Sequence, residues 1–343
     1  MVNVLLNIQR FINSISRNKI ARLFFLTIMI LLLGALGLSY FEETLRIQDS
    51  FWWSFVTITT VGYGDITPST IGGRIIAVIV MVFGIGLLGM FTATIASIFV
   101  EGKLKEGKGV KAVKVKGHFL ICGWSYKVKD IIAELRADHK VRDKPIVLIA
   151  DIPEKPLEDE NTFFIHGEVN TETLEKANLK GSSVVIILSD EGLDSYSRDA
   201  KTVLSTLTIR TLNPDVYICV EVSDAKNVQH CKMAGANEII VIGELSSNLL
   251  VQASLDHGIT HIITELVSNQ FGSVLYKIKP PQNLVGQPFI EVLTFLKKEH
   301  NAIALAVESP GEKGFMANPP KEYTIQPEDQ IVIVAQERPN FVK

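Results

Sequence analysis

The chain has 343 residues, enough for two or three domains. Its formal net charge of −3 at pH 7 gives no signal for nucleic-acid binding. Three widely spaced cysteines form neither a zinc motif nor an even disulfide framework, so we expect a reducing compartment. The first hundred residues hold an excess of apolar side chains, and this uneven distribution predicts a membrane part followed by a soluble part.

Two uncharged apolar runs lie in the first hundred residues, from Leu23 to Phe41 and from Ile75 to Val100. A spanning helix needs about 20 apolar residues, and both runs are long enough, so we expect both to cross a membrane. A signal peptide is disfavoured because Phe41-Glu42-Glu43 follows the first run where a cleavage site would need small residues.

Basic residues flank the outer ends of both predicted spans. The positive-inside rule therefore predicts that both chain ends lie in the cytosol. These residues are Arg10, Arg17, Lys19 and Arg22 before the first span, and Lys103, Lys105, Lys108, Lys111, Lys114 and Lys116 after the second.

Between the spans, the segment from Ser50 to Gly64 carries no charge and is too short to cross a membrane. It suits a re-entrant segment, which is stable at membrane depth only when protein or a watery cavity surrounds it. We expect a helix from Phe51 to Thr59, followed by an extended stretch. That stretch alternates two glycines with larger residues, which lets successive carbonyls turn toward one axis; it reads Thr60, Val61, Gly62, Tyr63, Gly64.

The motif Thr59-Thr60-Val61-Gly62-Tyr63-Gly64-Asp65 resembles the signature of the potassium-channel family. The resemblance implies that four subunits stack rings of oxygens from Thr60, Val61, Gly62 and Tyr63, and that these rings replace the hydration shell of K⁺. By resemblance to calcium-gated members, Gly84 is the gate hinge, whereas Gly86 and Gly89 serve packing. Some relatives have a glutamate where Val56 stands, so we expect Trp53 to hold Tyr63 and Asp65 here.

From Gly117 onward the pattern changes to buried strands that alternate with helices, which predicts a doubly wound parallel sheet. The expected strands are His118–Cys122, Pro145–Ala150, Thr162–Ile165, Val184–Leu188, Val216–Val222 and Glu238–Ile242. The expected helices are Lys129–Ala137, Thr171–Ala177, Ser195–Thr211 and Ala225–Ala234.

Ligands of such sheets bind beyond the carboxyl ends of the strands. Gly123 stands in the first turn there, and Asp151 ends the next strand, roughly where a ribose hydroxyl is usually met. A full GxGxxG loop would need glycine in place of Ser125 and Val128. A bound nucleotide and a purely structural Gly-Trp-Ser turn therefore both stay open.

The order of pore, basic linker and Rossmann-like domain resembles the RCK family, the regulators of K⁺ conductance. The resemblance implies crossover helices over 246–273, which pair such domains, and a small C-terminal lobe with strands at Ser273–Ile278, Ile303–Val307 and Gln330–Val334. The motifs that carry it are Cys122-Gly123-Trp124-Ser125, His166-Gly167-Glu168, Leu174-Glu175-Lys176-Ala177-Asn178 and Met233-Ala234-Gly235-Ala236.

We therefore expect an α-helical two-span ion-channel pore plus a cytosolic α/β Rossmann-like RCK domain with a small α+β C-terminal lobe. The expected divisions are a cytosolic segment 1–22, a pore domain 23–100 (spans 23–41 and 75–100, pore helix and filter 50–65), a linker 101–116, a Rossmann-like lobe 117–245, crossover helices 246–273 and a C-terminal lobe 274–343.

Two classes of gating ligand compete. We favour NAD(H) or an adenine nucleotide, with a divalent cation as a second, weaker effector; gating by calcium alone is the alternative. The residues expected at the nucleotide are Gly123, Trp124, Ser125, Tyr126, Asp151, Gly167, Glu168 and Ser189. By resemblance to calcium-gated relatives, a divalent cation would bind Glu168 and Glu221. A further acid of those relatives is replaced here by Ser223. Ca²⁺ is coordinated by six to eight oxygens, so the loss of one carboxylate weakens the expected site.

The resemblance also implies a homotetramer in the cell's inner membrane with an eight-membered RCK ring, whereas nucleic acid is not expected as a partner. Four subunits supply four RCK domains; we expect the others from an internal start at Val110 or Val113, or else from a second channel or another gene product. A membrane-anchored oxidoreductase is disfavoured because no triad or metal cluster accompanies the incomplete glycine loop. The pore within the chain makes a separate regulatory subunit an unneeded interpretation.

Overall fold

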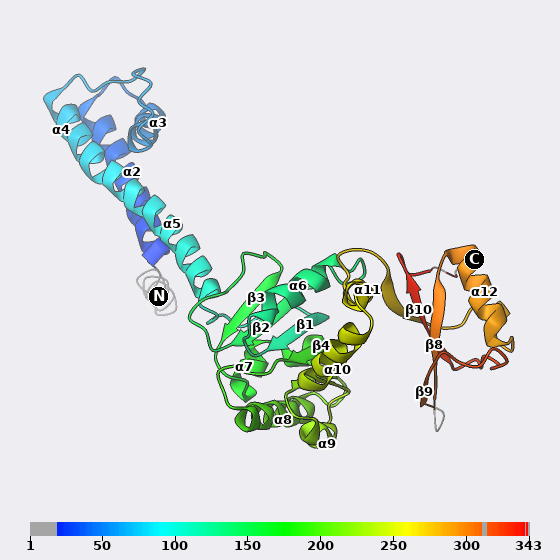
Figure 1. The fold of residues 1–343 in the computed structure, drawn as a ribbon. Helices are drawn as coiled ribbons and strands as arrows, with labels where there is room; N and C mark the ends of the chain where they lie inside the picture. The colour runs from blue at the N-terminus through cyan, green and yellow to red at the C-terminus, as the bar shows by residue number, and fades with distance from the viewer. Residues whose placement is uncertain (1–18, 311–313, 340, 342–343) are drawn as a thin grey trace, which may run out of the picture. The chain divides into compact units, whose positions relative to one another are not determined.

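A computed structural model describes residues 19–310, 314–339 and 341, so most of the predicted segment 1–22 lies outside the described residues. The chain divides into two compact units, one up to Lys105 and one from Glu106 onward (Figure 1). Two helical stretches are long and apolar enough to cross a membrane, Lys19–Phe41 and Ile71–Gly107. Both extend beyond the predicted spans, because helix continues into the flanking polar residues.

Over its described residues, 19–105, the regular elements of the first unit are all helices. A central cluster of buried side chains joins the first long helix, the short re-entrant helix and the second long helix: Leu38, Trp53, Ile58, Ala77 and Val80. The elements are α2 (Lys19–Phe41), α3 (Ile47–Ile58), α4 (Ile71–Ile79), a π-helical turn η1 (Val80–Ile85) and α5 (Gly86–Gly107).

The re-entrant helix α3 begins at Ile47, earlier than the predicted start at Phe51. Arg46 is extended and ends the preceding loop, while Asp49 stands in the first turn. A carboxylate in the first turn interacts favourably with the positive N-terminal end of the helix dipole. Asp49 therefore stabilises a helix that starts at Ile47.

The second unit contains a six-stranded parallel sheet in the order β3-β2-β1-β4-β5-β6, which confirms the predicted doubly wound fold. The chain runs outward from β1 in one direction and then returns to start again at β4 beside it. The strands are β1 (His118–Cys122), β2 (Ile146–Ala150), β3 (Thr162–His166), β4 (Ser182–Ile187), β5 (Tyr217–Val222) and β6 (Glu238–Val241).

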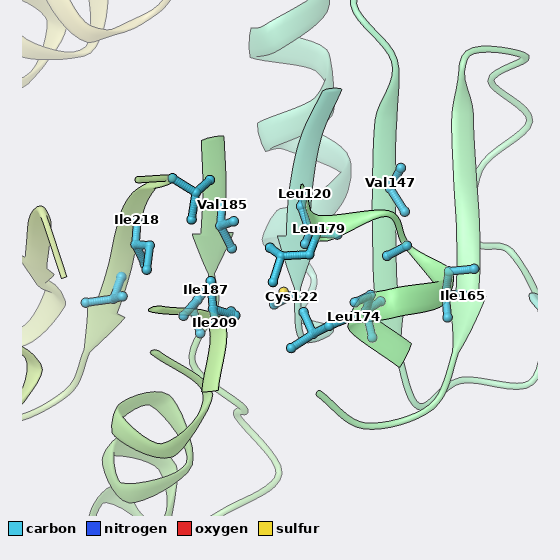
Figure 2. Close-up of a cluster of buried hydrophobic side chains, with 14 of the residues drawn as sticks. Leu120, Cys122, Val147, Ile165, Leu174, Leu179, Val185, Ile187, Ile209 and Ile218 are labelled. Carbon is cyan, nitrogen blue, oxygen red and sulfur yellow. The ribbon is translucent and has the colours of Figure 1, made fainter. Parts of the chain in front are cut away.

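Alternate residues of β1 to β4 enter two separate cores, one on each face of the sheet. Figure 2 shows the first core, where Leu120 and Val185 of neighbouring strands meet Leu174 of α7 (Thr171–Lys176) and Ile209 of α8 (Ser195–Leu212). The opposite core places Ile121, Ile146 and Leu148 against Val128 and Ile132 of α6 (Lys127–Ala137). Because both faces are covered there, the central strands are apolar over Phe119–Cys122 of β1 and Ile146–Ala150 of β2.

After the sheet, two helices lie in and beside the range 246–273, where crossover helices were predicted. Helix α10 (Ile242–Leu255) directly follows β6, and α11 (Ile259–Val267) follows a turn at Gly258. Gly258 has a φ of 91°, a conformation that is costly for a residue with a side chain, so the turn separates the two helices cleanly. Short elements complete the Rossmann-like lobe: η2 (Leu179–Gly181), η3 (Ala225–Asn227) and α9 (Val228–Met233).

The C-terminal lobe is an antiparallel sheet in the order β7-β10-β8-β9, packed against one helix, so the expected α+β lobe is confirmed. Strand β9 and the helix were not predicted individually; the strand is too short for a clear alternation. The elements are β7 (Val274–Ile278), η4 (Gln282–Leu284), α12 (Phe289–His300), β8 (Ile303–Ser309), β9 (Gly314–Ala317) and β10 (Gln330–Ala335).

Candidate functional site

The extended stretch after α3 has positive φ at every second residue: 62° at Thr60, 57° at Gly62 and 75° at Gly64. Such alternation is the backbone pattern in which successive carbonyls can turn to a common side. The N–H groups of Val61 and Gly62 donate to the Val56 carbonyl, at 3.0 and 3.4 Å. The end of α3 therefore holds the start of the stretch.

The side chains of this stretch are exposed in the single chain, with Val61 53% and Tyr63 68% exposed. A large exposed apolar surface usually marks a contact with something else. This exposure agrees with a segment that further copies of the chain surround.

A tryptophan of α3 holds the outer end of the stretch, but it is Trp52 and not Trp53 as predicted. The Trp52 indole N–H donates to Asp65 Oδ2 at 3.0 Å, and its ring stacks on Tyr63 with centroids 6.0 Å apart and planes 6° apart. Trp53 is instead 6% exposed in the cluster between the long helices. Neighbouring helix residues point about 100° apart, so one-residue precision is needed to choose between them.

A buried carboxylate holds the loop between the stretch and α4 in place. The sequence predicted no role for it at the filter. Glu42 follows α2 directly and accepts hydrogen bonds from the backbone N–H and hydroxyl of both Ser69 and Thr70, at 2.6 to 2.9 Å. The side-chain bond from Ser69 is the main reason that the pKa of Glu42 falls to about 2. The outer end of α2 is thereby tied to the loop that leaves Asp65.

The predicted hinge Gly84 lies in the π-helical turn η1, a geometry found mainly at functional positions. A Cβ atom on Gly84 would lie 2.7 Å from Ile58, the last residue of α3. Gly86 and Gly89 have no such neighbour within 4 Å in the described chain. Of the three glycines, the structure therefore shows that Gly84 is the one in close packing with the helix that precedes the stretch.

In the second unit, a cavity of about 180 Å³ opens at the carboxyl ends of strands β1 to β4. Gly123 follows β1 with φ 99°, and a Cβ there would lie 3.0 Å from the Leu188 carbonyl oxygen. Only glycine suits this position, because its backbone must turn and pass close to the neighbouring strand. The cavity is thus located at the point where the strand order reverses, the usual ligand crevice of such sheets.

Five of the eight residues expected at a nucleotide line this cavity: Gly123, Trp124, Asp151, Gly167 and Glu168. The other three do not. Ser125 and Ser189 are buried, 4% and 1% exposed, and their hydroxyls have no hydrogen-bond partner within the described part of the chain. Tyr126 is 69% exposed at the start of α6.

Two basic residues of α8 also line the cavity and were missed from the sequence, Arg198 and Lys201. Their spacing of three places them on one face of the helix, which is the signal that would have found them. Lys201 Nζ lies 2.7 Å from Glu168 and 2.8 Å from Asp190. Partial burial opposes the charge of Lys201, but the hydrogen bonds to Asp190 and Glu168 outweigh it and raise its pKa.

The two acids expected at a divalent cation, Glu168 and Glu221, are each paired with a lysine instead. Lys201 holds Glu168, while Lys127 Nζ lies 2.7 Å from Glu221 and 3.3 Å from Glu191. Among the described residues, no group of three or more His, Cys, Asp or Glu side chains is placed to hold a metal ion. In this structure each of the two carboxylates therefore lies beside an ammonium group, and a divalent-cation site at Glu168 and Glu221 stays a prediction.

Comparisons with known proteins agree with both units. Family models match residues 25–101 as an ion channel, 114–220 as a calcium-activated potassium channel slowpoke-like RCK domain, and 243–342 as Castor and Pollux, part of voltage-gated ion channel. The chain is 31% identical over 342 residues to the calcium-gated potassium channel TvoK of Thermoplasma volcanium, covering 95% of this chain and 94% of the relative. The chain belongs to this family of RCK-containing potassium channels.

The channel's fold is also similar to two solved structures. The human SLO3 gating ring is 18% identical with a TM-score of 0.52, covering 64% of this channel chain and 44% of that chain. The GsuK channel is 20% identical with a TM-score of 0.50, covering 91% and 56%. At these identities the likenesses concern the fold alone.

The first prediction concerns the tryptophan that holds the filter. In Trp52→Phe the ring still stacks on Tyr63, but the donor to Asp65 is lost. A partly exposed hydrogen bond to a carboxylate contributes about 1 kcal/mol, so single-channel recordings should show open bursts shortened about fivefold. Trp53→Phe is the comparison: it removes part of a buried side chain but leaves the Trp52–Asp65 bond, so it should shorten bursts less than Trp52→Phe; the reverse order would restore the original assignment to Trp53.

The second prediction concerns Gly84. Alanine favours a helix over glycine by about 1 kcal/mol at any of these positions, so Gly84→Ala and Gly86→Ala share that effect. Only Gly84→Ala also pushes a methyl group into Ile58. We expect Gly84→Ala to lower the open probability in bilayer recordings and Gly86→Ala to change it much less. An equal loss in both variants would assign the effect to helix stiffness alone.

Proposed function

We propose that this chain is one subunit of a potassium-selective channel that an adenine nucleotide or NAD(H) gates by binding in the cavity of the RCK domain. Family membership supports the channel over the alternative of an anchored oxidoreductase. The observation that carries the potassium selectivity is the filter motif with positive φ at Thr60, Gly62 and Gly64. Backbone oxygens of Thr60 to Tyr63 then coordinate K⁺ in place of water.

The third prediction is the selectivity itself. Under bi-ionic conditions with K⁺ on one side of a bilayer and Na⁺ on the other, the reversal potential should lie far from zero. Gly62 adopts a φ of 57°, which a side chain makes costly, so Gly62→Ala should abolish conduction or selectivity. A wild-type reversal potential near zero would exclude a potassium-selective filter.

The proposed nucleotide fits the charges around the cavity. Lys201 already pairs with Glu168 and Asp190, so Asp151 is the cavity carboxylate without a lysine partner and is left to accept from ribose hydroxyls. The Nε2 atom of His166 lies 3.8 Å from Oδ1 of Asp151. Opposite charge comes from Arg198, whose side chain lines the cavity and has a buried Nε without a partner among the described residues.

Close backbone approach is the second requirement of a phosphate site, and it is met at Gly123 and Gly167. Both glycines have positive φ, 99° and 130°, and both line the cavity. Glycine leaves room for a phosphate beside the backbone N–H groups. Trp124 adds an aromatic wall to the same cavity. These features support a nucleotide although the glycine loop is incomplete.

A divalent cation remains the second effector in this proposal. The cavity carries three acids against two bases, so a bound phosphate gains from an accompanying cation. The relative TvoK is a calcium-gated potassium channel, which supports gating by calcium alone as the alternative. Against that alternative, Lys127 and Lys201 occupy the carboxylates expected to bind Ca²⁺.

The fourth prediction separates these ligands by calorimetric titration of the full-length channel with NAD⁺, NADH, ATP, ADP and Ca²⁺. Asp151→Ala should weaken nucleotide binding about tenfold or more, because hydrogen bonds to a charged group contribute about 1.5–3 kcal/mol, and should spare any Ca²⁺ heat. Asp143→Ala, an exposed acid outside the cavity, is the control. Heat from Ca²⁺ alone would show that calcium is the ligand.

We also propose a homotetrameric pore in the inner membrane with both termini and the RCK domain in the cytosol. The basic residues beside both spans support this orientation. The fold likeness to a gating ring supports assembly of RCK domains into a ring. In this proposal separately translated RCK copies, or a second gene product, complete the eight-membered ring.

A further inference from the structure

The segment that leaves the pore is attached to the rim of the ligand cavity. The Gly107 carbonyl accepts a hydrogen bond from the Lys155 N–H at 2.8 Å, and the Gly109 carbonyl accepts one from the His166 N–H at 3.1 Å. His166 ends β3, immediately before the cavity residue Gly167. All of these groups belong to the second unit. The linker therefore has a defined anchor at the cavity edge.

Gly109 is suited to this anchor in a way that other residues are not. It is buried with φ 64°, and a Cβ atom there would overlap the His166 backbone nitrogen and lie 2.7 Å from the Phe164 ring. Gly117 in the same linker has nearly the same φ, 68°, but no atom within 4 Å of such a Cβ. At Gly109 the absence of a side chain is what permits the contact.

Beyond Gly109 the linker remains hydrogen-bonded to the RCK domain, so it is not a flexible coil. The Val113 N–H donates to the Lys176 carbonyl at 2.7 Å, and the Gly117 N–H donates to the Gly181 carbonyl at 2.7 Å. Val113 and Val115 also pack against the core on one face of the sheet. A chain held at several points transmits a displacement that a flexible coil would absorb.

The His166 side chain connects the anchor to the cavity. Its Nδ1 lies 2.7 Å from the Ile152 carbonyl oxygen, and its Nε2 lies 3.8 Å from Asp151 Oδ1. Asp151 and Ile152 both line the cavity. One residue thus meets the pore linker with its backbone and the proposed ribose-binding carboxylate with its ring.

We propose that Gly109 and His166 form the junction through which occupancy of the cavity reaches the pore. This inference rests on the proposed function, in which a nucleotide engages Asp151. A ligand that takes Asp151 removes the neighbour of His166 Nε2 and favours a different position of the β3 end. Because the Gly109 carbonyl is bonded to that end, the linker favours a different position too. A ligand can shift a gate only through such a difference between two states.

The test compares Gly109→Ala with Gly117→Ala in the full-length channel. Calorimetry with ADP and NADH measures binding, and bilayer recordings measure the change in open probability that each nucleotide causes. For Gly109→Ala we expect a dissociation constant within about twofold of wild type, but a nucleotide response reduced about fivefold or more, within the usual range of coupling between sites. Gly117→Ala carries the same backbone strain without the clash and should retain both.

A second variant covers the case in which Gly109→Ala does not assemble. His166→Asn keeps the backbone N–H and a side-chain donor near the Ile152 carbonyl, but its shorter side chain does not reach Asp151. It should bind nucleotide and respond weakly.

The outcomes separate the two proposals. Normal nucleotide responses in Gly109→Ala, or in His166→Asn where Gly109→Ala does not assemble, would overturn the junction and leave the nucleotide site standing. Absence of nucleotide heat in the wild-type channel would overturn the proposed ligand itself, and the junction with it.

Discussion

The structure of the first unit depends on one constraint: unpaired backbone groups are tolerated at membrane depth only inside a protein enclosure. In the predicted filter only Thr60, Val61 and Gly62 have backbone N–H groups bonded to the end of α3, and the rest of the stretch lies outside any helix or sheet, so neighbours must hold it. The Val56 carbonyl holds its inner end, and Trp52 holds Asp65 at its outer end. Glu42 ties the loop beyond to the first span. The long helices thus serve mainly to enclose and position a short piece of irregular chain.

The same enclosure joins the filter to the second span. Ile58, the last residue of the pore helix, is 2% exposed and packs against Gly84 of the π-helical turn. The π-helical turn, with its wider hydrogen-bond spacing, is a local irregularity in an otherwise regular helix. It lies where the second span contacts the pore helix that precedes the filter. Movement of the span and the shape of the filter therefore share one packing contact.

The charged side chains at the edge of the RCK sheet are paired with one another. Two lysines, Lys127 and Lys201, each lie between two carboxylates at the edge of the sheet and offset part of their charge. Lysine within hydrogen-bond distance of two acids takes the place of a bound cation without needing one from solution. This leaves Asp151 as the acid free to meet a ligand, beside the histidine to which the linker is bonded. In the function and junction proposed above, the residue that binds the ligand and the residue bonded to the pore linker lie next to each other at the ends of β2 and β3.

Much of this architecture is determined by the sequence alone. Run length predicts the spans, alternating glycines predict the filter backbone, and apolar strands at regular intervals predict the doubly wound sheet, since each depends on neighbours along the chain. Which tryptophan meets Asp65 depends on the rotational phase of α3, set by its start at Ile47. The pairing of Lys127 with Glu221 and the docking of Gly109 on His166 depend on contacts between segments far apart in the chain. Only the tertiary structure decides these, because no local pattern records which surfaces the fold brings together.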